Sequence, residues 1–505
     1  MKDPLNSTVG TDSYPVTLVP PRAQVESAVS LALFIQWGAL AFSALLLILP
    51  FGTFSKLPPA VVIWMTTGII FSLAAHGYKM AKEQGENPWL SPVSLLMSFY
   101  FFKYGLGTFS VYYWAQFPWE VYPGLSKAFE SYGLEFNLPN ACQLLLLGGM
   151  GLYLGARLSG HRIGNWLPSL RWQIDHSKFN HNLTLYTPIA LLFFVVLQWY
   201  IPEAIRFVVL LFSWLVWVLM LIVSYRFFLS DSGDRLKWLA LLILMYASLF
   251  SVFLTTGMRE HALKPVLFIV LGYVLARGKA PWRFVIPALL ALFVFISPWL
   301  SVYKVSKFTG PGRSVVERIN ETNEEIIAMS ARGRFELALD GFVGRVAGSG
   351  PVYVSVYSLY YPDVYPFELG QSFVMEMQSL MPRILWPEKP NLSAQLNQYT
   401  VAVGMNAEYD PYAETATAAT FDAISEYYVN FGAPGIFFLS LLQGYYLSIL
   451  YSWLVQRSNF EIGASIYLVL FFINHDFFSV VPTIVSHTRL LPVWLLMLYI
   501  LSRKS

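Results

Sequence analysis

Runs of about 20 consecutive apolar residues recur along almost the whole 505-residue chain, and an α-helix of that length crosses the hydrocarbon core of a bilayer. Within a bilayer the backbone N–H and C=O groups must pair inside each segment, so these runs are expected to be helices. The composition agrees, because 56% of the residues are hydrophobic and only 12% are charged. Soluble domains are about 25% charged. An ordinary soluble enzyme is therefore excluded, and the predicted fold class is an all-α polytopic membrane protein.

Hydropathy predicts about twelve transmembrane helices, of which the fifth and eighth are the shortest. Their ranges are 29–50, 58–78, 92–115, 138–157, 185–201, 205–225, 238–256, 262–277, 283–302, 433–454, 462–482 and 486–502. The polar residues before the first span lack a basic n-region, so this span is interpreted as a retained helix and not a signal peptide. The predicted organisation is a cytoplasmic tail (1–28), nine spans (29–302), one large extracytoplasmic segment (303–432) and three further spans (433–505).

The distribution of Lys and Arg predicts the orientation, because basic residues are enriched in cytoplasmic connections. With the N-terminus inside, the cytoplasmic segments hold 17 basic residues and the short outer connections hold six. Both termini are therefore predicted to be cytoplasmic. The outer segment 303–432 has nine basic and fifteen acidic residues, and neither its charge nor the net charge of +3 for the chain suggests nucleic-acid binding. The single cysteine, Cys142, excludes an internal disulfide.

The segment 303–432 is far longer than an ordinary connection between spans, which suggests that it has a function. A loop at 310–312 and an exposed helix at 317–325 are expected, followed by an amphipathic helix on the membrane surface within the apolar stretch 335–361. The segment is also rich in tyrosine. Tyrosine rings stack on sugars and also form belts at membrane interfaces, and both interpretations remain open.

The sequence contains no phosphate-binding Gly-rich loop, HExxH motif, GxSxG motif or Cys/His cluster. Neither a cofactor nor a metal is expected. Glu408 and Asp410 are closely spaced acidic residues in the outer segment. Chance spacing in an acidic loop is the simpler interpretation of this pair, with metal binding as the alternative.

Basic residues at the predicted outer rim are the main candidates for binding a phosphate group; they are Arg259, Arg345, Arg383, Lys389 and Arg489. Arg259 lies in a very short outer turn, where it could bind a phosphate with both guanidinium nitrogens or pair with Glu260. Arg345 lies in the apolar stretch of the outer segment, where it is either a phosphate ligand or part of a structural ion pair. Arg383 and Lys389 flank a turn stiffened by three prolines, which suits either a diphosphate clamp or a solvated turn.

Ionisable residues inside predicted spans are costly and indicate functional positions. Lys103 lies in the middle of the third span, and the eleventh span contains a second polar group. One interpretation is an ion pair of Lys103 with Asp476 inside the bundle. The other is a polar cavity lined by Lys103, His475 and Asp476.

Several short motifs resemble those of the Wzy-type oligosaccharide repeat-unit polymerases of bacterial surface polysaccharides; they are Thr255–Arg259, Met381–Arg383, Trp386–Pro390, Glu426–Gly435 and Gly444. The resemblance covers residues 250–450 at motif level, and the multi-span layout agrees over the whole chain. It implies a metal-independent inverting glycosyltransferase of the GT-C type in the bacterial cytoplasmic (inner) membrane. Such an enzyme transfers a growing glycan from its undecaprenyl diphosphate carrier to the next lipid-linked repeat unit.

The resemblance also implies roles for particular residues and partners. Arg259, Arg383 and Lys389 match basic positions of the family motifs. The implied partners are the undecaprenyl-diphosphate-linked oligosaccharide and the lipid bilayer, with a chain-length regulator as a further candidate.

The chemistry of such a transfer can also be stated from the substrate. A sugar joined to a lipid diphosphate is already activated, so the protein must neutralise the leaving diphosphate and deprotonate the acceptor hydroxyl. Glu426 is favoured as the base because it precedes a span at the level where the leaving group must lie. The candidates for the base are Asp340, Glu408, Asp410, Asp422, Glu426, Asp476 and His487, and Glu426, Asp422 and His487 form the predicted catalytic set. For His487 the simpler interpretation is a histidine at a helix end whose ring is satisfied by hydrogen bonds.

Three other functions stay open. An O-antigen ligase uses the same donor but delivers the glycan to lipid A core; such ligases usually present a histidine in the large outer loop, and residues 303–432 contain none. A transporter or lipid-linked oligosaccharide flippase should concentrate ionisable groups at the bilayer midplane, where Lys103 is the main example. A non-enzymatic scaffold or sensor is disfavoured, because the outer segment has little of the patterning of a soluble core.

Overall fold

The computed structural model of the protein describes residues 22–115, 134–158, 161–164, 166–171, 174–197, 214–309, 312–346, 350–378, 422–473 and 479–502, and also 380–381, 385–386, 388, 398–399 and 401–403. Every regular element in these ranges is a helix, which confirms the prediction of an all-helical chain over the described residues. Among the described residues, five helices are long and apolar enough to cross a membrane: Pro59–Glu83, Gly233–Thr256, Trp282–Ser306, Ala423–Gln456 and Val480–Ser502. The chain is therefore a membrane protein by the length and composition of these helices.

The helices before the large segment are α1 (Arg22–Ile48), η1 (Phe54–Lys56), α2 (Pro59–Glu83), α3 (Pro92–Tyr100), η2 (Phe101–Gly105), α4 (Leu106–Ala115), α6 (Leu134–Arg157), α7 (His161–Gly164), α8 (His176–Leu192), η3 (Phe193–Leu197), α11 (Leu215–Leu229), α12 (Ser232–Thr256), α13 (Glu260–Arg277), α14 (Trp282–Ala291), η4 (Leu292–Ile296) and α15 (Ser297–Thr309). Those that follow are α16 (Val315–Ala328), α17 (Ala331–Val346), α18 (Gly350–Tyr360), α19 (Gln371–Gln378), α21 (Ala423–Tyr451), η5 (Ser452–Gln456), α22 (Phe460–Ile473) and α23 (Val480–Ser502). Each of the twelve predicted spans overlaps a helix, but the count of twelve crossings stays a prediction.

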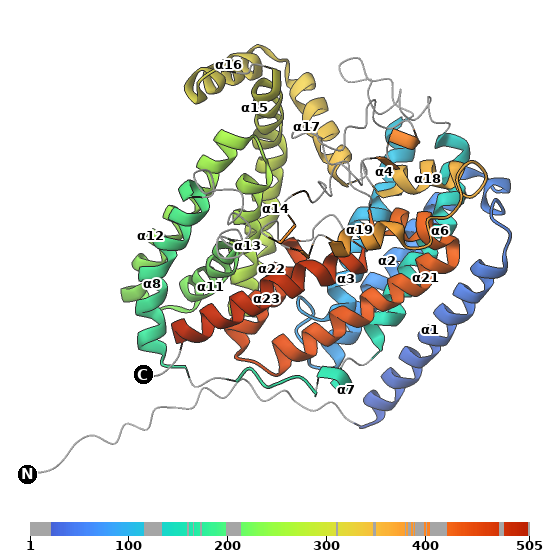
Figure 1. The fold of residues 1–505 in the computed structure, drawn as a ribbon, viewed down its shortest axis with the longest axis horizontal. Helices are drawn as coiled ribbons and strands as arrows, with labels where there is room; N and C mark the ends of the chain where they lie inside the picture. The colour runs from blue at the N-terminus through green and yellow to red at the C-terminus, as the bar shows by residue number, and fades with distance from the viewer. Residues whose placement is uncertain are drawn as a thin grey trace, which may run out of the picture.

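The helices form two neighbouring groups (Figure 1). In one group α6 and α21 lie side by side, with α1, α2, α3 and α18 packed around α6. In the other group α11 packs against α12 and α13. Helices α22 and α23 join the groups. Helix α22 packs on α11 and on η5, which continues α21, and α23 packs on α21 and on α8, a neighbour of α11.

Small residues explain the close approach of α6 and α21. A Cβ atom added to Gly155 of α6 would lie 1.9 Å from the carbonyl oxygen of Leu441, and one added to Gly444 of α21 would lie 2.4 Å from that of Leu152. Glycine at these positions lets the two backbones touch, which is a common basis of helix association in membranes. The contact fixes α21, the helix that carries Asp422 and Glu426.

A buried ion pair joins α11 to α22. Arg226 of α11 donates from Nε to Glu461 of α22 at 2.6 Å, and a second guanidinium nitrogen contacts the other carboxylate oxygen. The side chains are only 16% and 11% exposed, so this is a two-pronged pair shielded from solvent.

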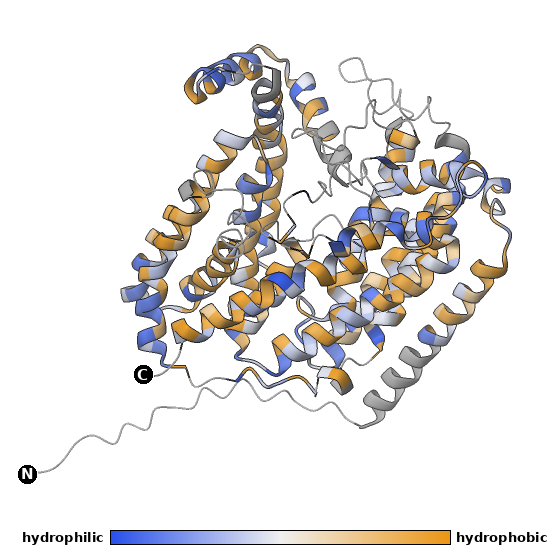
Figure 2. Cartoon of the chain, viewed as in Figure 1, coloured by the Kyte–Doolittle hydropathy of each residue, from blue (hydrophilic) through white to orange (hydrophobic). Residues whose placement is uncertain are grey.

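The predicted outer segment contains short helices. Helix α15 continues past residue 303, and α16 follows it at the top of Figure 1. The predicted exposed helix 317–325 lies inside α16, which begins with a reciprocal cap between Ser314 and Glu317. Hydrophilic residues gather on α16, whereas hydrophobic residues cover the long helices (Figure 2). The apolar stretch 335–361 falls on two helices, α17 and α18.

Candidate functional site

The first residues of α21 form the centre of a buried polar network. Asp422 caps the helix, and its Oδ1 accepts hydrogen bonds from the backbone N–H groups of Ile424 (2.9 Å) and Ser425 (3.2 Å). The same oxygen accepts a hydrogen bond from the Tyr104 hydroxyl at 2.9 Å, and Oδ2 accepts one from the Ser425 hydroxyl at 2.7 Å. Asp422 is only 2% exposed. Its carboxylate therefore both caps α21 and links this helix to η2.

Glu426 lies one helical turn after Asp422 and is equally buried. Its Oε1 accepts a hydrogen bond of 2.5 Å from the hydroxyl of Ser372 on α19. The amide nitrogen of Asn430 donates to the Ser372 oxygen and to the Glu426 backbone carbonyl, both at 2.8 Å. These bonds fix the Glu426 carboxyl group in one orientation between α19 and α21.

A break in α21 explains why α19 lies against this helix. Gly432 has φ 67° and ψ −157°, which favours glycine, and Pro434 has no N–H to offer the carbonyl of Asn430. The carbonyls of Val429 and Asn430 instead accept hydrogen bonds from the N–H groups of Glu368 (3.0 Å) and Leu369 (3.1 Å). The Asn430 side chain accepts a third from the Gly370 N–H at 2.8 Å. The break thus docks the segment that leads directly into α19.

Glu376, one turn after Ser372 on α19, brings a further carboxyl group to this network. It is 4% exposed, and its Oε2 has no hydrogen-bond partner among the described residues. Burial, followed by the charge of nearby Glu426, raises the pKa of Glu376 to about 10. At neutral pH it is therefore a carboxylic acid, which can donate as well as accept a hydrogen bond. We call Ser372, Glu376, Glu426 and Asn430 the carboxyl network.

Lys103 lies close enough to Asp422 for the two charges to interact. It is buried in η2, a π-helical turn, which is a distortion found often at functional sites. Its ammonium group is 5.7 Å from the centre of the Tyr104 ring, and its charge acts on the Asp422 carboxylate. Gly350, the first residue of α18, packs against the same tyrosine ring. Lys103 therefore has an acidic neighbour in Asp422; Asp476 and His475, its predicted companions, lie outside the described residues.

His487, the third residue of the predicted catalytic set, lies on α23 and not at the start of α21. Its Nδ1 is 3.0 Å from the Tyr446 hydroxyl, the two rings stack with centroids 5.7 Å apart, and its Nε2 is 3.3 Å from the Leu470 carbonyl oxygen. The ring is 2% exposed. These contacts hold the imidazole between α21, α22 and α23, whereas Asp422 and Glu426 meet at the start of α21.

The predicted outer cations are only partly described. Arg259 is half-buried in the turn between α12 and α13, two residues after Gly257 (φ 74°), while Glu260 forms an ion pair with Lys264 at 2.6 Å. Arg489 is half-buried on α23. Arg345 belongs to α17, and its side chain is outside the description. Arg383 and Lys389, like Glu408 and Asp410, lie outside the described residues.

The carboxyl groups are not arranged for a metal ion. Within the described ranges, no three His, Cys, Asp or Glu side chains come together in a group that could hold one. Hydroxyl, amide and carboxyl groups joined by hydrogen bonds are instead suited to holding and moving protons.

Sequence reasoning identified Asp422 and Glu426 but missed their partners on other helices. Ser372 and Glu376 are spaced four apart and so share one face of α19, a pattern that could have indicated a polar face. Asn430 lies within the motif Glu426–Gly435. The residues around Tyr104 do not indicate its role, because that role depends on a hydrogen bond to Asp422, more than 300 positions away in the sequence.

Residues 55–471 match a protein family described as "Domain of unknown function (DUF8712)". The match covers most of the chain and includes the whole carboxyl network. No curated protein and no solved structure matches the chain.

Proposed function

The chain belongs to the DUF8712 family, and we propose that it is an inverting membrane glycosyltransferase of the GT-C type. The proposed reaction transfers a glycan from undecaprenyl diphosphate to the next lipid-linked repeat unit, at the outer face of the bacterial inner membrane. The observation that carries the proposal is the buried hydrogen bond from Ser372 to Glu426 beside the carboxylic acid of Glu376. The sequence resemblance to Wzy-type polymerases supports the same reaction.

Glu426 is the proposed general base. A hydroxyl donating to its carboxylate at 2.5 Å has the geometry that proton transfer requires. An acceptor sugar hydroxyl that replaces the Ser372 hydroxyl would occupy this position. Its proton would pass to Glu426 while its oxygen bonds to the anomeric carbon of the donor. The bond from that carbon to the diphosphate oxygen would break, and undecaprenyl diphosphate would leave.

The leaving diphosphate requires positive charge, and the proposal assigns this role to the predicted outer cations. Arg259 and Arg489 are both half-buried, so their guanidinium groups would act in a medium less polar than water. Arg345, Arg383 and Lys389 are proposed to complete the set. A guanidinium that binds a phosphate with two nitrogens is stronger and more directional than an ammonium contact.

The proposed orientation places both termini in the cytoplasm and α16 to α19 outside. This orientation follows from the distribution of basic residues, and it puts the start of α21 at the outer end of its span. A GT-C architecture and about twelve crossings complete the proposal.

A flippase or transporter for lipid-linked oligosaccharide is the second candidate. The interruption of α21 at Gly432 and the buried Lys103 beside Asp422 favour it, because transporters bind substrates at broken helices and at ionisable groups within the membrane.

One reconstitution separates these functions. The purified protein is placed in vesicles with a single defined lipid-linked repeat unit and no nucleotide. Polymer and released undecaprenyl diphosphate are expected. Transfer only after lipid A core is added would identify a ligase, and movement of the lipid between leaflets without new glycosidic bonds would identify a flippase; either result would refute the polymerase.

A further inference from the structure

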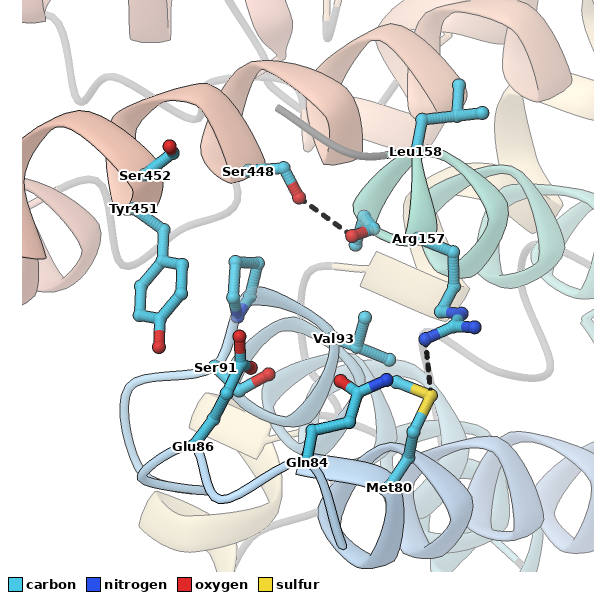
Figure 3. Close-up of a pocket in the computed structure, with 12 residues that line it drawn as sticks. Met80, Gln84, Glu86, Ser91, Val93, Arg157, Leu158, Ser448, Tyr451 and Ser452 are labelled. Carbon is cyan, nitrogen blue, oxygen red and sulfur yellow. Dashed lines mark hydrogen bonds between the residues drawn. The ribbon is translucent and has the colours of Figure 1, made fainter. Parts of the chain in front are cut away.

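A polar cavity lies at the end of α21 opposite to the carboxyl network. It has a volume of about 240 Å³ and is lined by the end of α2, the start of α3, the end of α6 and the junction of α21 with η5 (Figure 3). A hydrogen bond joins two of the helices that line it, because the Ser448 hydroxyl of α21 donates to the Ala156 carbonyl of α6 at 2.7 Å. This cavity is separate from the proposed catalytic residues and requires its own explanation.

Opposite charges face each other across the cavity. Arg157 and Glu86 lie on opposite sides, with the Gln84 amide between them in the view of Figure 3. The Arg157 guanidinium contacts the Met80 sulfur, a weak acceptor, and its buried Nε has no hydrogen-bond partner among the described residues. No ion pair found within the described part of the chain includes Arg157. Glu86 accepts a long hydrogen bond of 3.5 Å from the Gln456 amide.

The position of the cavity suits the headgroup of a membrane lipid. It lies where the apolar helix α2 ends in the charged residues Lys79, Lys82 and Glu83, which is the depth expected of a lipid headgroup. Leu158 lines the cavity and is 47% exposed, so an apolar side chain lies at its edge, where an acyl chain would leave. A guanidinium supplies two donors for a phosphate, and a carboxylate accepts from a primary ammonium.

We propose that this cavity binds a phosphate group joined to a primary amine, the headgroup chemistry of phosphatidylethanolamine, with the phosphate on Arg157 and the ammonium on Glu86. The charge pattern distinguishes this headgroup from an anionic one, since phosphatidylglycerol would present no cation to Glu86. The inference does not depend on the proposed glycosyl transfer.

Native mass spectrometry of the full-length protein in detergent tests the proposal, with phosphatidylethanolamine and phosphatidylglycerol of identical acyl chains added in turn. The wild type is expected to retain phosphatidylethanolamine about tenfold more strongly, the ratio that roughly one favourable charged contact provides. Glu86→Gln should abolish this preference while the protein still binds both lipids, whereas Arg157→Gln should weaken both. Arg277→Gln, an exposed cation outside the cavity, is the matched control and should change neither.

Two results would overturn the proposal: equal retention of the two lipids by the wild type, and an unchanged preference in Glu86→Gln. Displacement of the lipid by water-soluble phosphoethanolamine at equal concentration would uphold the proposed headgroup chemistry and assign the site to a soluble ligand. Because Glu86→Gln is judged by a ratio between two lipids on one folded protein, the test remains decisive if Arg157→Gln does not fold.

Discussion

Glu376 shows how one residue takes its properties from contacts that are distant in sequence. Its neighbours on α19 give no sign of an unusual carboxyl group; burial and the nearby Glu426 raise its pKa to about 10. The position of Glu426 before a span can be predicted from the neighbouring sequence alone, so this residue is a candidate base without knowledge of the fold. Its partners Ser372 and Asn430 could not be identified in this way, since they meet only after α19 docks on α21.

Replacing Glu376 with Gln should change how stability depends on pH. Because the folded pKa of Glu376 lies above that of the unfolded chain, its stabilising contribution is complete below about pH 4.5 and is lost as the pH rises toward 10. Glu376→Gln stays neutral at every pH. From pH 5 to 9, thermal unfolding in detergent should therefore show the free energy of unfolding of the variant rising relative to that of the wild type. The rise should be at most on the order of 1 kcal/mol per pH unit.

The exposed Glu325 of α16 provides the control for this measurement. Glu325→Gln should follow the wild-type curve at every pH. Parallel curves for Glu376→Gln and the wild type would show that Glu376 ionises in the folded protein as it does in water.

At the scale of elements, the sequence indicates where helices lie more reliably than how they meet. The apolar runs predicted the helices because periodicity and length are local, and the Gly432-Ala433-Pro434 sequence carries the signal for a break in α21. The consequence of that break, the docking of residues 368–370, depends on carbonyl groups left without helical partners. The sequence does not identify the segment that supplies those partners.

The glycine contact between α6 and α21 gives a prediction for this packing. In Gly155→Ala the new Cβ would lie 1.9 Å from a backbone oxygen that cannot rotate away. The helices must separate, which should lower the free energy of unfolding by about 1–3 kcal/mol. Thermal unfolding of the purified protein measures the loss.

Gly68 of α2 is the matched control, because a Cβ added there has nothing within 4 Å. Gly68→Ala should be neutral or stabilising by up to about 1 kcal/mol. Equal effects of the two substitutions would mean that α6 and α21 are not in backbone contact.

For the whole molecule, the proposed orientation is open to a direct labelling test. Cys142 is buried and is the only cysteine, so replacing it with Ala gives a background for single reporters. In intact cells a membrane-impermeant maleimide should label Glu324→Cys on α16. It should label Lys82→Cys, at the end of α2, only after the cells are opened. The reverse pattern would invert the topology and place the carboxyl network on the cytoplasmic side.

The central claim is that the carboxylate of Glu426 accepts the proton during glycan transfer, and one variant tests it most directly. Glu426→Gln keeps the shape of the side chain and can still hydrogen-bond Ser372, but it cannot act as a base. In vesicles supplied with the lipid-linked repeat unit, its rate of polymer formation should fall at least about 100-fold, the lower end of what a positioned base contributes. Glu325→Gln should retain the wild-type rate. Polymer formed by folded Glu426→Gln at the wild-type rate would contradict the account.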